Sequence, residues 1–250
     1  MPAARALVMA IAVAAFAMLI FSGPGTRYGL WPWETGLSLL SWAAYTGLAG
    51  AVGALGLILM LVVPKWRARP WIPILALCIA LAAAAPPLIL LEQAKSAPPI
   101  HDISTDVFDA PTFIALAQAR AKSPNGTVYG GLEVAAQQQK AYPDIKSAIL
   151  KTPPAQSVQR ALDAARACGW EVVSSDAPAG RIEATATTRW FGFKDDIVVR
   201  VRPEGSGSRV DVRSVSRVGE SDIGANAKRV REFLARLTQN RAFARLEKNP

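Results

Sequence analysis

Metal ligands and reactive thiols are scarce in this chain, which has one histidine and two cysteines among 250 residues. Cys78 lies in an apolar run and Cys168 in a polar region, so we do not expect them to form a disulfide, and no CxxC motif occurs. Metal binding and thiol redox chemistry therefore lack their usual ligand sets. We expect neither a metal nor a cofactor.

Charge is also scarce, but only in the first third of the chain. Up to Leu91 the sequence has six charged residues, namely Arg5, Arg27, Glu34, Lys65, Arg67 and Arg69. The remainder has 41, of which 23 are Lys or Arg and 18 are Asp or Glu. Three apolar runs fill the charge-poor part, at 6–21, 37–63 and 71–91. Since about 20 apolar residues span a bilayer as a helix, residues 1–92 are predicted to form a transmembrane region of three helices.

The first apolar run is the shortest and follows a lone Arg5, a pattern that also resembles a secretory signal peptide. Its exit, through Phe21, Ser22 and Gly23, has no clear small-x-small cleavage signal. We favour a retained membrane span over a cleaved peptide.

The loop between the second and third runs carries Lys65, Arg67 and Arg69. Because basic loops stay on the cytoplasmic side, the amino terminus is predicted to be cytoplasmic and the part after Leu91 periplasmic. The sequence thus predicts an integral protein of the inner (cytoplasmic) membrane.

Small residues recur along the second run, including Gly47, Gly50, Ala51 and Ala54. Such residues let helices approach closely in lipid. We expect this face to pack either within the chain or against a second copy, as a homo-oligomer.

The polar part divides into a linker at 93–126, a soluble domain at 127–240 and a tail at 241–250. Pro98, Pro99 and Pro111 interrupt the linker, which shows no periodicity. Pro86 and Pro87 are expected to end the third span by Ala85.

Alternation of apolar and polar residues dominates the soluble domain. Ile182, Ala184 and Ala186 alternate with polar neighbours, as in a half-buried strand. Helical patterns occupy 155–168 and the segment after Ser221, which is expected to cap the last helix. We predict an α+β fold, a two-layer antiparallel sheet and helix sandwich that follows the three-helix transmembrane region, with one sheet face uncovered.

In the strand that contains Val210 and Val212, the alternation of apolar and polar residues changes. Val210 and Val212 would face one side of the sheet and Val215 the other, and a bulge at residues 213–214 would place all three on the same side. A strand that simply ends there is the alternative.

Three stretches carry a family resemblance, namely GWE at 169–171, GRIEATATTRWFGFKDD at 180–196 and RSVSRVGESDIGANAKRVR at 213–231. They resemble the bacterial and plastid family of domain of unknown function (DUF) 1499. The resemblance implies a membrane or envelope domain, and it brings no catalytic residue to these positions.

Our first functional hypothesis is a noncatalytic binding or scaffold domain for an envelope protein partner, a membrane lipid, an anionic headgroup or a polymer. Despite a net charge of +9, no nucleic-acid-binding motif is present, so a nucleic-acid partner is rejected. The predicted contacts lie on the sheet face and at the start of the last helix, and they are Arg181, Glu183, Arg189, Arg200, Arg213, Arg217, Ser221, Asp222 and Asn226.

Two alternatives remain open. Ser221 and Asp222 could bind an anion through the helix start or could cap that helix themselves, and self-capping is favoured. Asp195 and Asp196 could serve a carboxylate-based, possibly metal-assisted envelope hydrolase. Adjacent strand residues point to opposite faces, however, so a plain structural role ranks above the hydrolase.

Overall fold

The computed structural model describes residues 2–66 and 69–246, and the chain forms two compact units. The first runs up to Ser96 and includes residues 189–192, and the second comprises 97–188 and the chain from Phe193 onward. Each unit is described by itself below.

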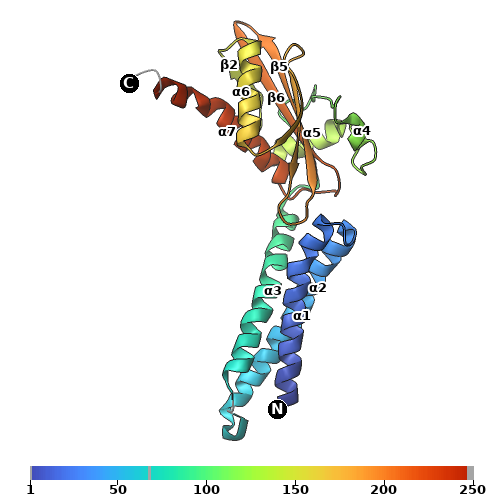
Figure 1. Cartoon of the computed structure of the whole chain (residues 1–250), viewed down its shortest axis with the longest axis vertical. Helices are drawn as coiled ribbons and strands as arrows, with labels where there is room; N and C mark the ends of the chain where they lie inside the picture. The colour runs from blue at the N-terminus through green and yellow to red at the C-terminus, as the bar shows by residue number, and fades with distance from the viewer. Residues whose placement is uncertain (1, 67–68, 247–250) are drawn as a thin grey trace. The chain divides into compact units, whose positions relative to one another are not determined.

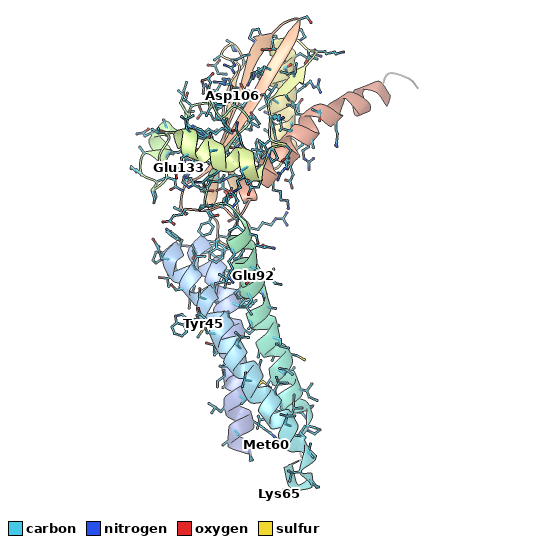
Figure 2. The ribbon with its side chains drawn as sticks, turned by 180° about the vertical axis from the view of Figure 1, so that it is seen from behind. Tyr45, Met60, Lys65, Glu92, Asp106 and Glu133 are labelled. Carbon is cyan, nitrogen blue, oxygen red and sulfur yellow. The ribbon has the colours of Figure 1, made fainter. Side chains whose placement is uncertain are left out.

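Three long helices make up the first unit, which we call the membrane unit (Figure 1). They are α1 (Pro2–Arg27), α2 (Trp33–Leu59) and α3 (Trp71–Ser96), with short 3-10 turns η1 (Met60–Val62) and η2 (Pro64–Trp66) between α2 and α3. All three are long and apolar enough to cross a membrane, which confirms the three helices predicted for this region. In Figure 2, Lys65 lies at one end of this helix bundle and Glu92 toward the other. Arg67, part of the predicted basic loop, lies outside the described residues.

The small residues of α2 pack inside the bundle. A methyl group added to Gly47 would lie 2.8 Å from the Ala80 carbonyl oxygen on α3, and one on Gly50 would lie 3.4 Å from Ile11 on α1. The predicted close packing therefore occurs within the chain, while an additional role in a homo-oligomer stays a prediction.

The third helix differs from the prediction. It continues through Pro86 and Pro87 to Ser96 instead of ending by Ala85. Membrane helices tolerate proline where neighbouring helices pack against it, and Pro87 is buried in the bundle.

The second unit is built on a six-stranded antiparallel sheet. Its strands are β1 (Asp102–Ser104), β2 (Ala148–Leu150), β3 (Glu171–Asp176), β4 (Arg181–Thr187), β5 (Lys194–Glu204) and β6 (Gly207–Ser216). The order is β1-β6-β5-β4-β3, and β2 pairs with β6 beside β1. The long β5–β6 hairpin forms the centre of the sheet.

Helices α6 (Pro154–Ala167) and α7 (Ala225–Leu246) bury one face of the sheet (Figure 1). Val158 and Phe233 from these helices pack with Ile182 and Val199 from the strands. Trp170 stacks on Phe233 with ring centroids 5.2 Å apart. The predicted α+β sandwich is confirmed. Helix α7 extends into the predicted tail as far as Leu246, and residues 247–250 lie outside the described part.

The opposite sheet face is covered, although the sequence predicted it to be open. Residues 105–130, which we call the strap, cross it and include the short helix α4 (Ala117–Arg120). Phe113 and Leu116 of the strap form a second apolar cluster with Val198 and Val215. Helix α5 (Gly131–Ala141) follows the strap.

The predicted linker at 93–126 is therefore wrong in its structural character. Residues up to Ser96 extend α3, residues 102–104 form β1, and the rest belongs to the strap. The predicted bulge at residues 213–214 is also absent, because β5 and β6 stay in continuous register from Glu204 to Asp195. Val215 points to the strap, where its own apolar cluster receives it. A register shift occurs instead in β3, between Val172 and Ser174.

Candidate functional site

Arginines on the sheet hold the strap by donating hydrogen bonds to its backbone carbonyl groups. Arg181 donates to Thr112, and Arg200 donates to the Asp109 carbonyl at 2.7 Å. Arg213 reaches the carbonyls of Pro111 and Thr127, each at 3.1 Å. Outside α4 the strap has no regular secondary structure, so its carbonyl groups need other partners, and each guanidinium supplies several donors at once.

Arg213 is the most deeply buried of these three arginines, with 1% of it exposed. Its guanidinium forms a two-point ion pair with the Asp102 carboxylate, at 2.7 and 2.9 Å. The rings of Phe113 and Tyr129 each lie 5.4 Å from it, within cation–π range. Burial, aided by the Asp102 charge, raises the pKa of the Tyr129 phenol to about 12.

Glu183 is fully buried and binds the strap through backbone amides. Its carboxylate accepts hydrogen bonds from Ile114 at 2.7 Å, Ala115 at 3.2 Å and Leu116 at 2.8 Å. These three N–H groups belong to the residues directly before α4. Glu183 thus fastens the strap to β4 just ahead of that helix.

Asp196 lies on the strap face between two arginines. Arg120 donates to it at 2.9 Å, Arg217 at 2.8 and 2.9 Å, and the Thr185 hydroxyl at 2.8 Å. Burial alone would raise the pKa of Asp196, but the hydrogen bonds from Arg217 and Thr185 and the charge of Arg217 outweigh it and lower this pKa.

Asp195 points to the helix face instead. Its carboxylate pairs with Arg229 of α7 at 2.5 Å, and Arg229 also donates to the Ser214 hydroxyl at 3.1 Å. The two aspartates of the hydrolase hypothesis are therefore on opposite sides of the sheet and do not converge. Within 2–66 and 69–246, no group of three or more His, Cys, Asp or Glu residues could hold a metal ion.

The start of α7 caps itself, which confirms the favoured alternative. The Asp222 carboxylate accepts from the amides of Gly224 at 2.8 Å and Asn226 at 2.6 Å. The Ser221 hydroxyl accepts from Ile223 at 3.2 Å. Burial raises the pKa of Asp222. The Asn226 side chain is itself buried, with its amide oxygen bonded to Ser214 at 2.6 Å.

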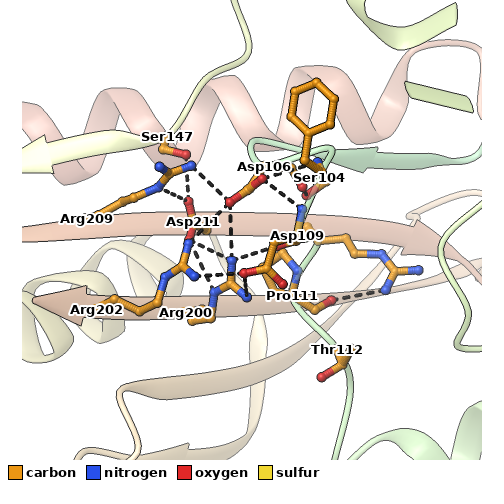
Figure 3. A network of polar contacts seen from close by, with 12 residues as sticks. Ser104, Asp106, Asp109, Pro111, Thr112, Ser147, Arg200, Arg202, Arg209 and Asp211 are labelled. Atoms are coloured by element: carbon orange, nitrogen blue, oxygen red, sulfur yellow. Dashed lines mark hydrogen bonds and ion pairs between the residues drawn. The ribbon is translucent and has the colours of Figure 1, made fainter. Parts of the chain in front are cut away.

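A third ionic cluster lies farther along the strap face, where three arginines meet three aspartates (Figure 3). The buried carboxylate of Asp211 binds Arg200 and Arg202 at 3.0 Å each, and Arg209 at 3.0 Å. Asp106 of the strap binds the same three arginines, at 3.5, 3.2 and 3.0 Å. The opposite charges are balanced in number, so this cluster fastens the strap's first part to β5 and β6.

The extent of this fold agrees with a comparison to known families. Residues 102–237, more than half of the chain, match the family described as "Protein of unknown function (DUF1499)". The chain belongs to the DUF1499 family. The match begins at β1 and ends within α7, so the DUF1499 domain includes the strap that the sequence interpretation assigned to a linker. A search of curated proteins found no match.

Of the predicted binding residues, Glu183, Arg213 and Asn226 are buried inside this DUF1499 domain, and Arg189 is exposed in the turn 189–192. Arg181, Arg200, Arg217, Ser221 and Asp222 are partly exposed. Each of these except Arg189 has a side-chain contact inside the soluble domain. Apart from Arg189, the side chains expected to contact a ligand thus hold the strap, pair within the sheet or cap α7, and ligand binding by them stays a prediction.

The sequence interpretation did not find a cavity of about 380 Å³ in the DUF1499 domain. Its walls come from the start of the strap, from α5 and the segment that follows it, and from β6. Its lining includes Asp106, Phe108, Gln138, Tyr142, Lys146 and Arg209. Gln138 exchanges two hydrogen bonds with the backbone of Ser104, at 2.9 and 2.7 Å, and so closes the free edge of β1. The cavity wall is therefore built from residues more than 30 positions apart in sequence, and no short motif marks it.

Proposed function

We propose that this DUF1499 protein is an integral inner-membrane protein whose soluble domain faces the periplasm and binds an anionic envelope ligand, a lipid headgroup or a polymer segment, without catalysis. Three membrane-length helices support the membrane assignment, and the basic residues Lys65 and Arg69 between α2 and α3 support the orientation. The cavity beside Arg209 is the observation that carries the binding role.

The lining of this cavity combines the two features that ligand sites share, apolar walls and a few polar groups. Phe108 is 82% exposed and Ile149 is 62% exposed, which is unusual for large apolar side chains unless they contact a ligand or partner. Tyr142, Gln138 and Ser147 add hydrogen-bonding groups to the same lining.

The charge of the lining favours an anion. Asp106 is already neutralised, because three arginines bind its carboxylate. Lys146 is exposed and forms no ion pair with the residues that the structure describes. Arg209 uses its Nε and one terminal nitrogen for Asp211 and Asp106, which leaves the other terminal nitrogen to donate. Lys146 and Arg209 would together bind a phosphate or carboxylate.

The proposed ligand contacts lie at the cavity beside Arg209, whereas the sequence analysis placed them on the sheet face around Arg213 and Glu183. Arg213 and Glu183 shape the strap, and the strap in turn supplies Asp106 and Phe108 to the cavity wall. The buried ion pairs thus position the site, whereas Lys146, Arg209 and Phe108 would contact the ligand.

The test is native purification of the full-length protein from gently solubilised membranes, with mass spectrometry of copurifying lipids, polymers and proteins. Lys146→Glu reverses the cavity charge, and Phe108→Ala removes its exposed ring. Lys122→Glu is the matched control, because Lys122 is also an exposed lysine but does not line the cavity.

An anionic component that copurifies with the wild type and with Lys122→Glu, but is lost from Lys146→Glu and reduced with Phe108→Ala, is the expected result. Equal recovery from all four proteins would contradict a ligand site at this cavity. All three variants should unfold at nearly the same temperature as the wild type, since surface substitutions change stability by about 0.5 kcal/mol or less.

A further inference from the structure

A second cavity, of about 570 Å³, lies in the membrane unit toward the end where α1 and α3 finish and α2 begins. Glu92, labelled in Figure 2, lies toward the same end. The three helices and the turn 189–192, which belongs to this unit, form its walls. The lining includes Leu19 of α1, Leu40 of α2, Ala85 and Ile89 of α3, and Trp190 and Phe191 of the turn. Gln93 of α3 adds a polar amide to this apolar lining.

The turn 189–192 packs closely on the helices at two glycines. A methyl group added to Gly23 of α1 would lie 2.0 Å from the Trp190 ring, and one on Gly36 of α2 would lie 3.1 Å from the Phe191 ring. Arg27, the last residue of α1, also donates to a backbone carbonyl of the turn at 2.7 Å. The two aromatic rings are therefore held against the helices and form one wall of the cavity.

Small side chains on α3 leave this space open. Ala85 has only a methyl group and the ring of Pro86 is compact, and both line the cavity together with Leu19 and Leu40 from the other two helices. Packed protein contains few voids larger than a water molecule. A cavity of this size between helices therefore calls for an occupant.

The depth of the cavity favours hydrocarbon as that occupant. At 1.5 Å per helical residue, Leu19 lies about 12 Å before Arg27 at the end of α1, inside a helix long and apolar enough to cross a membrane. Ile20 and Ile89, which are 38% and 58% exposed, continue the lining onto the outer surface of the bundle. A bound water needs several polar partners, and this lining supplies few.

The position of Gln93 distinguishes between kinds of lipid chain. It lies one turn beyond Ile89, about 6 Å nearer the end of α3, so its amide meets the chain where the chain joins its polar part. The chain of a diacyl phospholipid carries an ester carbonyl there, which accepts a hydrogen bond from an amide N–H. An isoprenoid chain has no such carbonyl. Tryptophan, here Trp190, also favours the level of a bilayer at which these esters lie.

From this combination we propose that the cavity binds one acyl chain of a phospholipid, with Gln93 donating to its ester carbonyl and the rings of Trp190 and Phe191 packed along the chain. The proposal rests on the membrane assignment in the proposed function. It does not depend on what the cavity of the soluble domain binds.

The experiment uses the full-length protein in nanodiscs made from equal amounts of a diacyl phosphatidylcholine and its dialkyl ether analogue, which lacks the ester carbonyls. Native mass spectrometry then counts each lipid retained after release from the disc. Ile89→Trp fills the cavity from an exposed position, and Gln93→Leu removes the amide. Leu81→Trp is the matched control, because Leu81 is a 49% exposed aliphatic residue two turns earlier on α3 that does not line the cavity.

The wild type and Leu81→Trp should retain one phospholipid, with the diacyl form favoured about fivefold, the contribution of a single hydrogen bond. Ile89→Trp should lose the retained lipid, and Gln93→Leu should retain the two forms equally. Lys146→Glu, which tests the soluble domain, should retain lipid as the wild type does.

Equal retention by Ile89→Trp and Leu81→Trp would overturn the proposal, because the lipid would then lie elsewhere on the bundle. Equal retention of the diacyl and ether lipids by the wild type would overturn the role of Gln93. An isoprenoid lipid bound in place of a phospholipid, in protein purified from its own membranes, would also contradict the assignment. None of these results would affect the ligand proposed for the soluble domain, so the two proposals fail separately.

Discussion

Replacing Arg213 with alanine should destabilise the soluble domain severely, although the sequence analysis assigned Arg213 to a binding surface. The guanidinium makes two bonds to the Asp102 carboxylate, at 2.7 and 2.9 Å, and two to backbone carbonyls. Without it, a carboxylate that is 3% exposed loses its ion-pair partner. Breaking a buried ion pair in this way costs about 3–5 kcal/mol.

The assay is hydrogen exchange of the β6 amides in the full-length protein, followed by mass spectrometry over a urea series. Arg166→Ala is the control, because Arg166 is exposed on α6, and it should stay within about 0.5 kcal/mol of the wild type. If Arg213→Ala behaves like Arg166→Ala, the interpretation of the strap as an ion-paired, structural covering is wrong.

Two more predictions concern the same sheet. Burial alone would raise the pKa of Asp211, but hydrogen bonds from Ser147, Arg209 and Arg200 outweigh it and lower this pKa. A lowered carboxyl pKa stabilises the fold above about pH 4, and this stabilisation is lost as the pH falls. The unfolding temperature measured from pH 6 to pH 2 should therefore decline less steeply in Asp211→Asn than in the wild type. An unchanged slope would contradict this contribution. Gly180 has φ of 63° and a methyl group there would lie 2.2 Å from the Val201 carbonyl oxygen, whereas Gly205, at 55°, faces open space. Gly180→Ala should therefore lower the free energy of unfolding by more than about 1 kcal/mol relative to Gly205→Ala, and it should unfold at a clearly lower temperature. Equal effects of the two substitutions would show that β4 and β5 can move apart there.

The parts of the fold that sequence could predict are those where apolar residues repeat with a fixed period. The three membrane helices and the alternation of Ile182, Ala184 and Ala186 belong to this group. The same geometry correctly separated Asp195 from Asp196, because neighbours on a strand face opposite sides.

The strap could not be predicted in this way. Its segment has no hydrophobic period, and its attachments run from side chains such as Arg213 to backbone carbonyls about 100 positions away. A backbone carbonyl has no sequence signature. The bulge predicted at residues 213–214 is wrong for a related reason. Val215 is apolar because it packs on Phe113 and Leu116 of the strap, on the face that the sequence predicted to be uncovered.

The cavity beside Arg209 was missed because its walls come from separate segments. Phe108, Lys146 and Arg209 are brought together by the pairing of β6 with both β1 and β2. The exposed Phe108 was the available signal, since a large apolar residue in a stretch without hydrophobic periodicity contributes little to any predicted core.

The most direct test of the binding role is a hydrogen-exchange footprint of the protein in its isolated membranes, compared with the same protein after purification into phosphatidylcholine nanodiscs. A ligand in the proposed cavity should slow exchange at residues 105–109 and 138–149 in the membranes, with β3 unchanged as an internal reference. Slower exchange at those two segments, lost in Lys146→Glu, is the result that the proposal predicts. Identical exchange in both preparations, or protection confined to other parts of the domain, would contradict it.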